Sequence, residues 1–235
     1  VSHSSVKNPL VKEMDASLQA LRSALITSID NQLVALNAQI KSQQNYSGQV
    51  TSQIASNPNQ AGNYKNEGDV YNREHSMPKS WFNDARPMYT DLVHLVPTDG
   101  YVNGRRSNYP FGETDSPSYT SAGGFSKLGP SSVSGYSGIV FEPNDEYKGD
   151  FARIYFYMVT CYEENVSTWN SDMLAHNKYP ALTEWALKML LKWAAEDPVS
   201  QKEIDRNNAV YGFQQNRNPY VCLLYTSDAA DDLLC

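Results

Sequence analysis

Two short blocks of this sequence carry side chains that together could hydrolyse a phosphodiester. The first block, residues 72–81 (NREHSMPKSW), places Glu74 directly before His75. The second block, residues 91–108 (DLVHLVPTDGYVNGRRSN), is an apolar stretch that leads into a segment rich in amide and guanidinium groups. An imidazole can act as a base, hard oxygen atoms can hold a divalent cation, and guanidinium groups bind phosphate. This combination of groups suits the hydrolysis of a phosphodiester.

His75 is the candidate general base, because an unperturbed imidazole titrates at about pH 6.5 and can take a proton from water at neutral pH. Glu74 and Asn103 are the candidate metal ligands. Their oxygen atoms suit Mg²⁺, with Mn²⁺ or Ca²⁺ as substitutes, better than they suit zinc. One carboxylate and one neutral amide would leave the ion with net positive charge, which could stabilise a departing 3′ oxygen. Asn103 is followed by Gly104, and this dipeptide also favours a turn, which is the alternative interpretation of Asn103.

Arg105 and Arg106 are the best candidates for contacts with substrate phosphates, because a guanidinium group binds phosphate oxygens through paired hydrogen bonds. We expect one of the two to be a structural ion-pair partner instead. The other candidate cations are Arg73, Lys79, Arg86 and Arg217. The formal net charge of −7 argues against binding of nucleic acid through a broad positive surface and favours a local basic cleft.

The adjacency of Glu74 and His75 poses a geometric problem, because neighbouring residues of a regular strand point to opposite faces. The two side chains could serve one site if the backbone leaves regular geometry there. They could also do so if the scissile phosphate straddles the edge of the strand. Pro78 removes a backbone donor just downstream and favours an irregular strand end, but the sequence leaves both possibilities open.

The elements that must position these residues follow from periodicity and from breaker residues. Apolar residues at spacings of three and four predict a helix over residues 9–42, packed on the core or, alternatively, used to bind a partner. Residues 43–68, rich in Asn, Gln, Ser and Gly, predict a linker. We expect strands around residues 69–76 and 91–97, a long surface loop with at most short strands over 114–138, and helices capped by Asp150, from about Thr183 and from Pro198. Helical spacing predicts a buried apolar face on the first of these helices (Phe151, Ile154, Tyr155, Met158, Val159 and Tyr162) and on the second (Leu182, Trp185, Ala186, Met189, Leu190 and Trp193). This order indicates an α+β fold.

Three further motifs lie downstream, at residues 110–113 (PFGE), 148–158 (KGDFARIYFYM) and 216–220 (NRNPY). Together with the first two blocks they resemble the bacterial endonuclease I family, a branch of the His-Me finger (ββα-metal) nucleases, over about residues 64–221. The resemblance implies an α+β fold with a ββα-metal core, several surrounding helices and long loops, preceded here by a helical extension and linker over residues 1–63. It also implies that His75 activates a water molecule and that Glu74 and Asn103 hold a single Mg²⁺ ion.

The activity that the resemblance implies is non-specific, metal-dependent endonucleolytic hydrolysis of DNA, with RNA as a further substrate and a 5′-phosphate on the product. Members of the family are usually periplasmic or exported. We therefore expect a periplasmic or secreted protein, monomeric and without a membrane partner. Some members carry an additional acidic residue at the position of Tyr89, and here Glu113 or Asp91 would have to take its place.

Two other classes of function remain open at this point. A catalytically inactive, secreted module that binds nucleic acid or another partner would have the same fold. A zinc hydrolase would use His75, His94 and carboxylates, but the sequence has no His-x-x-x-His pair. Residues 222–235 resemble the translation of a sequencing adapter, and we expect them to be an artefactual tail.

Overall fold

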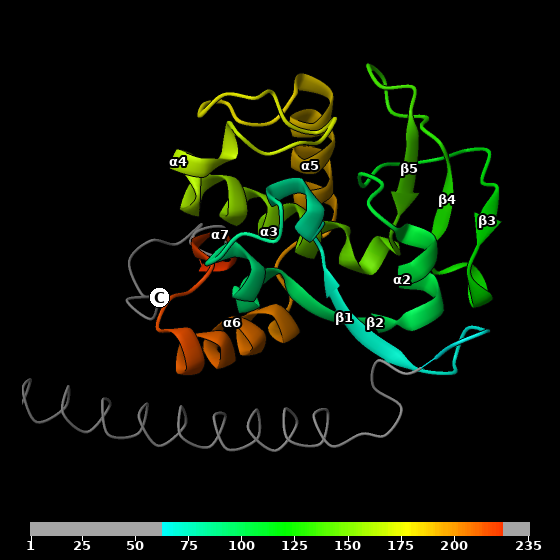
Figure 1. Cartoon of the computed structure of the whole chain (residues 1–235), viewed down its shortest axis with the longest axis horizontal. Coiled ribbons are helices and arrows are strands. Elements are labelled where there is room, and N and C mark those ends of the chain that lie inside the picture. Colours follow the sequence, from blue (N-terminus) through cyan, green and yellow to red (C-terminus); the bar gives the residue numbers. More distant parts are fainter. Residues whose placement is uncertain (1–62, 223–235) are drawn as a thin grey trace, which may run out of the picture. The chain divides into compact units, whose positions relative to one another are not determined.

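Two antiparallel strands and the helix that follows them carry both chemical blocks (Figure 1). Strand β1 (Tyr71–His75) pairs with β2 (Leu95–Asp99), and Glu74 lies opposite Val96. Helix α2 (Gly100–Arg106) follows β2 without an intervening loop. The succession of strand, strand and helix matches the expected ββα core, and the combination of helices with small antiparallel sheets confirms the α+β fold class.

The structure, a computed structural model, describes residues 63–222. The helix expected over residues 9–42, most of the linker expected over residues 43–68, and the tail beyond Cys222 lie outside the described residues. Within them, no helix combines the length and apolar character needed to cross a membrane.

Asp99 fixes the start of α2. Its Oδ1 atom accepts hydrogen bonds from the backbone N–H groups of Tyr101 at 2.8 Å and Val102 at 3.0 Å, which have no acceptor within the helix. Asn103 and Gly104 therefore lie inside a helix, and the turn considered for this dipeptide is wrong. Because α2 packs against β1, the helix brings Asn103 to the strand that carries the first chemical block.

The second strand begins later than the sequence predicts, because a 3₁₀ turn takes up the residues before it. Asp91 accepts a hydrogen bond from the backbone N–H of Val93 at 2.9 Å and caps the turn Leu92–His94. Arg206, on helix α6 (Gln201–Gln214), donates to three backbone carbonyls of the turn and of the first strand residue, at 2.7 to 3.0 Å. These bonds fix the point at which β2 starts.

The rest of the described chain forms a three-stranded antiparallel sheet and a group of helices. The sheet has the order β3 (Tyr119–Thr120), β4 (Lys127–Pro130) and β5 (Ile139–Glu142). The remaining helices are α3 (Lys148–Cys161), α4 (Glu163–Val166), α5 (Glu184–Glu196) and α7 (Pro219–Cys222). Two of the three short strands lie within residues 114–138, where the sequence predicts a long loop with at most short strands.

Helix α3 packs against α5 and α7 and lies in the middle of the helical part (Figure 1). Its side of the core includes Ile154, Tyr155 and Met158, all of which the periodicity places on one buried face. Helix α5 contributes Met189 and Trp193 to the same core. The prediction of an apolar face on each of these helices is confirmed.

Two of the predicted helix starts are wrong by a few residues. Helix α3 begins at Lys148 and not at a cap formed by Asp150, because a 3₁₀ turn capped by Asn144 leads directly into it. Helix α6 begins at Gln201 and not at Pro198. Ser200 accepts a hydrogen bond from the Glu203 backbone N–H, and the Glu203 side chain accepts one from the Ser200 backbone, so this reciprocal pair sets the start.

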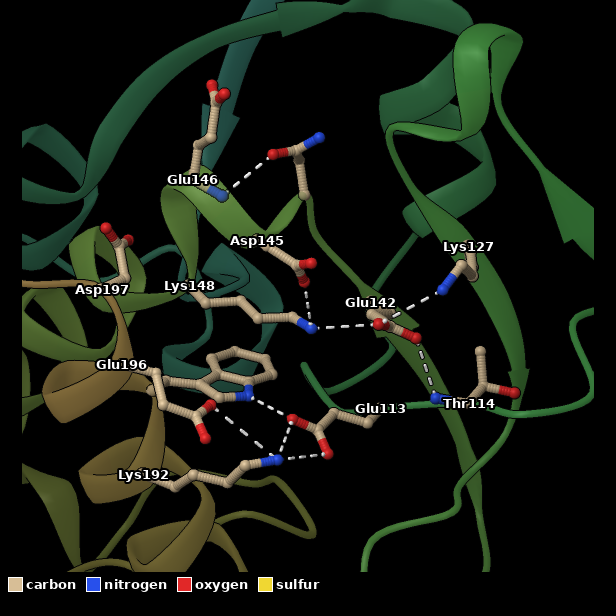
Figure 2. Close-up of polar contacts among 12 residues, drawn as sticks. Glu113, Thr114, Lys127, Glu142, Asp145, Glu146, Lys148, Lys192, Glu196 and Asp197 are labelled. Atoms are coloured by element: carbon tan, nitrogen blue, oxygen red, sulfur yellow. Dashed lines mark hydrogen bonds and ion pairs between the residues drawn. The ribbon is translucent and has the colours of Figure 1, made fainter.

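Two carboxylates, one on the three-stranded sheet and one in the segment that precedes it, are bound by α3 and α5, as Figure 2 shows. Glu142, on β5, accepts a hydrogen bond from Lys148 Nζ at 3.0 Å. Glu113 accepts hydrogen bonds from Lys192 Nζ at 3.0 Å and from the indole N–H of Trp193 at 2.8 Å. Because each carboxylate is neutralised by a lysine of a neighbouring helix, the contacts hold the sheet and the helices together.

Candidate active site

The predicted base and the two predicted metal ligands line one hollow. The hollow has a volume of about 210 Å³. Its walls come from β1, from the turn after β1, from α2 with the residues that follow it, and from one tyrosine ahead of β1: Tyr64, Asn72, Arg73, Glu74, His75, Pro78, Lys79, Asn103, Gly104, Arg106, Ser107 and Asn108. Glu74, His75 and Asn103 therefore face a common space.

The free edge of β1 explains how neighbouring residues of one strand reach the same hollow. β1 pairs only with β2 in a two-stranded sheet, so within residues 63–222 no strand covers its other edge. Four consecutive residues, from Asn72 to His75, line the hollow. At a free strand edge a ligand can be approached by residues of both faces of a regular strand. Of the two possibilities that the sequence leaves open, the straddled edge fits this arrangement.

Glu74 is buried and paired with Arg106. Arg106 Nη1 donates to Glu74 Oε1. The Arg106 side chain is only 3% exposed and the Glu74 side chain only 12%. A buried carboxylate needs such a partner, because an uncompensated charge in a protein interior is strongly unfavourable. The second oxygen of Glu74 receives no hydrogen bond within the described part of the chain. That oxygen is free to bind a ligand in the hollow.

Arg106 is engaged by the protein and has no surface from which to contact substrate. Its Nη1 also donates to the backbone carbonyl of His75 at 2.9 Å, and its Nη2 donates to the carbonyl of Ser76 at 2.6 Å. The phenol of Tyr155, on α3, donates to the same Ser76 carbonyl at 2.8 Å. Arg106 is therefore the structural ion-pair partner that the sequence predicts for one of the two arginines, and its assignment as a phosphate contact does not fit this burial.

Asn103 is held by a neighbour that the sequence analysis did not single out. Its Nδ2 donates to Asn72 Oδ1 at 2.6 Å. With the side-chain nitrogen engaged in this way, the side-chain oxygen Oδ1 of Asn103 remains as the atom that can bind a cation, and no donor from the described residues reaches it. The spacing offers a signal for Asn72: it lies two positions before Glu74 and therefore shares the Glu74 face of β1.

His75 lies half-buried at the end of β1, and its ring has one fixed hydrogen bond. Nε2 lies 3.0 Å from the backbone carbonyl of Tyr89. Because a carbonyl oxygen only accepts, Nε2 carries the proton in the neutral ring and Nδ1 is left with a free lone pair. Partial burial is the main cause that lowers the pKa of His75, and the charges of Lys79 and Arg73 lower it further. The imidazole is therefore kept in its basic, neutral form at neutral pH.

His94 is a core residue and not a second base. It is completely buried, and its Nε2 donates to the backbone carbonyl of Met88 at 2.8 Å. Its ring meets the ring of His75 edge to face, at a centroid distance of 5.3 Å. Burial lowers the pKa of His94 to about 4. The ring supports His75 from behind as a neutral group. The sequence places His94 on a strand, facing the core or supporting the site; the core position is confirmed, but the residue ends the 3₁₀ turn Leu92–His94 and not a strand.

The low pKa of His94 predicts that the protein loses stability in acid. The unfolded chain takes up this proton near pH 6.5 and the folded chain only near pH 4, so the unfolded state binds more protons between these values. The stabilisation is complete above pH 6.5, and about 2 kcal/mol of it should be lost by pH 4.5. Urea unfolding at pH 7 and pH 4.5 measures the loss. His94→Gln, which keeps a donor for the Met88 carbonyl, should show a smaller loss, and equal losses would contradict the assignment.

The two acids considered as substitutes at the Tyr89 position do not reach the hollow. Asp91 accepts hydrogen bonds from the phenols of Tyr157 at 2.8 Å and Tyr162 at 2.6 Å, and it is buried among them. Glu113 is the partner of Lys192 and Trp193 in the network of Figure 2. Neither residue lines the hollow, so within the described residues Glu74 is its one carboxylate.

Arg73 and Lys79 are the exposed cations that line the hollow. Lys79 forms an ion pair with Asp84 at 2.6 Å. The Arg73 guanidinium forms no ion pair with any described residue. Arg105, the predicted phosphate contact, is exposed but does not line the hollow. Its side chain donates to the Tyr101 hydroxyl and lies against two tyrosine rings. Arg73 and Lys79 are two of the other candidate cations of the sequence analysis, and the position of Arg73 two residues before His75 on the strand favours it over Arg105.

Neither a zinc centre nor a second, larger cavity competes with this hollow as the candidate site. No three His, Cys, Asp or Glu residues within the range 63–222 lie close enough together to hold a metal ion. A cavity of about 450 Å³ borders Glu74 and Arg106 as well, but its walls are mainly apolar and exclude His75. Of these two cavities in the described part of the chain, the smaller hollow is the one that adds the base His75 to the oxygen ligands Glu74 and Asn103.

Comparison with known proteins places these residues in a family context. The family model described as Endonuclease I matches residues 4–223. An extracellular ribonuclease of Bacillus amyloliquefaciens is 37% identical over 165 residues, which cover 67% of this chain and 53% of the relative. An Endonuclease-1 of Buchnera aphidicola subsp. Baizongia pistaciae is 33% identical over 132 residues, or 56% of this chain and 46% of the relative. The chain thus spans about half the length of the curated relatives that it matches.

Proposed function

Because this chain belongs to the endonuclease I family, we propose that it is a metal-dependent endonuclease that hydrolyses phosphodiester bonds in DNA and RNA. The observation that carries the proposal is the hollow shared by Glu74, His75 and Asn103. The names of the relatives support a nuclease, since one is named an extracellular ribonuclease and another an Endonuclease-1, and the first name supports RNA as a substrate. An inactive binding module is less well supported, because the base and both oxygen ligands are present together.

The donor set of the hollow fits a hard divalent cation such as Mg²⁺. The free oxygen of Glu74 and the amide oxygen of Asn103 would hold the ion, and Asn72 would orient that amide. One carboxylate paired with Arg106 and one neutral amide cannot neutralise a divalent ion. When bound, the ion would supply positive charge next to the phosphate and the departing 3′ oxygen.

His75 would act as the general base through Nδ1. The Tyr89 carbonyl fixes the proton on Nε2, so Nδ1 is the atom that can take a proton from a water molecule. The oxygen of that water attacks phosphorus, the bond between phosphorus and the 3′ oxygen breaks, and the 5′-phosphate stays on the downstream strand. Because burial lowers the pKa of His75, the ring is ready to accept the proton at neutral pH.

Arg73 and Lys79 would bind the phosphate backbone at the rim of the hollow. Both are exposed and line it, and a guanidinium group keeps its charge at any working pH. This local pair of cations explains how a chain with a net charge of −7 can attract nucleic acid. We also propose that the protein acts outside the cytoplasm, which the names of its Bacillus relatives support.

The nuclease proposal is tested by incubating the purified chain with supercoiled plasmid and with a labelled RNA. We expect nicking, linearisation and RNA fragmentation in the presence of Mg²⁺, products that carry 5′-phosphates, and complete loss of cleavage when EDTA removes the ion. Cleavage that persists in EDTA would contradict the role of the ion. Binding of either substrate without turnover in Mg²⁺, Mn²⁺ or Ca²⁺ would instead identify an inactive binding module.

A further inference from the structure

Tyr64 lies along helix α2 at the wall of the hollow. A Cβ atom on Gly104 would lie 2.6 Å from the Tyr64 hydroxyl oxygen, and one on Gly100 would lie 3.0 Å from Cδ1 of the same ring. Gly100 and Gly104 are about one helical turn apart, so the Tyr64 ring packs along the helix surface over both glycines. A side chain at position 104 would meet the Tyr64 hydroxyl first, and one at position 100 would meet Val70 as well as the ring. The Tyr64 side chain is nevertheless 38% exposed, because it has the helix on one side and open space beyond.

The segment that carries Tyr64 is anchored at several points. Asp69 accepts hydrogen bonds from the backbone N–H groups of Lys65 and Asn66, both at 2.8 Å, which closes a turn directly after Tyr64. Asp99, the residue that caps α2, accepts a further hydrogen bond from the Gly68 backbone at 2.7 Å. The ring is therefore held at the hollow by its own turn and by the cap of the helix on which it rests.

Tyr64 begins a row of aromatic rings that runs away from the hollow. Its ring meets that of Tyr101 edge to face, at a centroid distance of 6.4 Å and an angle of 83°. The Arg105 guanidinium lies 5.0 Å from the Tyr101 ring and 5.2 Å from the Tyr119 ring. Such alternation of tyrosine and arginine beside a phosphate-binding site is the composition of surfaces that bind unpaired nucleotides.

We propose that the exposed face of Tyr64 stacks against an unpaired nucleobase next to the scissile phosphate, so that single-stranded nucleic acid is the preferred substrate. The inference rests on the proposed nuclease function of the same hollow and names its substrate class. A base in a duplex has both faces covered by its neighbours and offers only its edges to a protein. A base in a single strand can place its face on the ring, and Arg105 can then bind the adjoining backbone.

The first test compares kcat/KM for a labelled single-stranded oligonucleotide with that for the same strand annealed to its complement. We expect the wild-type protein to prefer the single strand. Tyr64→Leu should lose roughly 5- to 100-fold on the single strand, mainly through KM, and little on the duplex. Tyr64→Phe should retain the preference. Tyr109→Leu is the matched control, because Tyr109 is 40% exposed but does not line the hollow, and it should behave as wild type.

The second test measures binding by fluorescence anisotropy and needs no turnover. Wild type should bind the single strand more tightly than the duplex. In a series of single strands that each carry one abasic nucleotide at a different position, one position should abolish the difference in affinity between wild type and Tyr64→Leu. Equal loss of single-strand and duplex affinity in Tyr64→Leu would overturn the proposal and indicate a structural role for Tyr64. Equal affinity of wild type for the single strand and the duplex would also overturn it. If binding follows the expectation but no cleavage occurs, the stacking inference stands and the proposed nuclease function fails.

Discussion

Replacing His75 with alanine is expected to lower kcat by about 10²- to 10⁴-fold on any nucleic acid that the protein cleaves, because that is the usual contribution of a positioned general base. Nδ1 is the one ring nitrogen left to accept a proton, since Nε2 is engaged by the Tyr89 carbonyl. Alanine removes the acceptor without placing a new group in the hollow. Single-turnover cleavage at saturating enzyme, with excess Mg²⁺, measures the chemical step directly.

A control must separate loss of the base from loss of the fold. His75 is only half-buried, so His75→Ala should change the unfolding midpoint little. His176→Asn alters an exposed histidine that does not line the hollow and should leave both activity and stability unchanged. The assignment of His75 as base is refuted if His75→Ala cleaves at the wild-type rate, whatever His176→Asn does.

The two strands of the ββα core could be predicted from the sequence because their signals are local in the chain, whereas helix α2 was expected only from the family resemblance. An acid beside an imidazole, a short strand and an amide-rich segment after a second strand can each be read from consecutive residues. The structure places Glu74, His75 and Asn103 at one hollow, as the sequence predicts. The apolar faces of α3 and α5 were predictable for the same reason, since helical periodicity appears in any window of a few turns.

Contacts between residues far apart in the sequence determine two features that the sequence did not predict. The start of β2 depends on Arg206, which reaches it from α6. The hydrogen bond between Asn72 and Asn103 depends on how α2 packs against β1. The start of α6 is a different case: Ser200 and Glu203 are a local capping pair, and the proline three residues before the helix was given more weight than this signal.

The choice between Arg105 and Arg106 shows the same limit in one dipeptide. Adjacent helical residues point about 100° apart, so only one of the two can face the strand. Which one does depends on where the helix begins, and Asp99 determines that by capping it. With this start, Arg106 turns inward to Glu74, and Arg105 turns outward to Tyr101 and the solvent. The residue type predicts a cation at both positions. It does not predict which of the two side chains the helix turns toward the strand.

The second large effect is expected for Arg106→Leu, which should lower the free energy of unfolding by about 3–5 kcal/mol. The substitution leaves the Glu74 carboxylate buried without a countercharge, and it also removes donors from the carbonyls of His75 and Ser76. Urea or thermal unfolding at pH 7 measures the loss. Arg105→Leu is the matched control one residue away: Arg105 is exposed, so its removal should cost less than about 1 kcal/mol.

A double substitution decides whether the buried charge is the cause. In Glu74→Leu/Arg106→Leu no charge is left uncompensated, so part of the stability lost in Arg106→Leu should return. Because the same variant lacks the Glu74 carboxylate, calorimetry should detect no Mg²⁺ binding to it. Replacing only the acid, as in Glu74→Gln, should weaken ion binding while Arg106 keeps its two carbonyl acceptors and the fold survives. If the double variant loses as much stability as Glu74→Leu and Arg106→Leu lose singly when added together, the pair is not coupled, and Arg106 would hold the strand end through its backbone contacts alone.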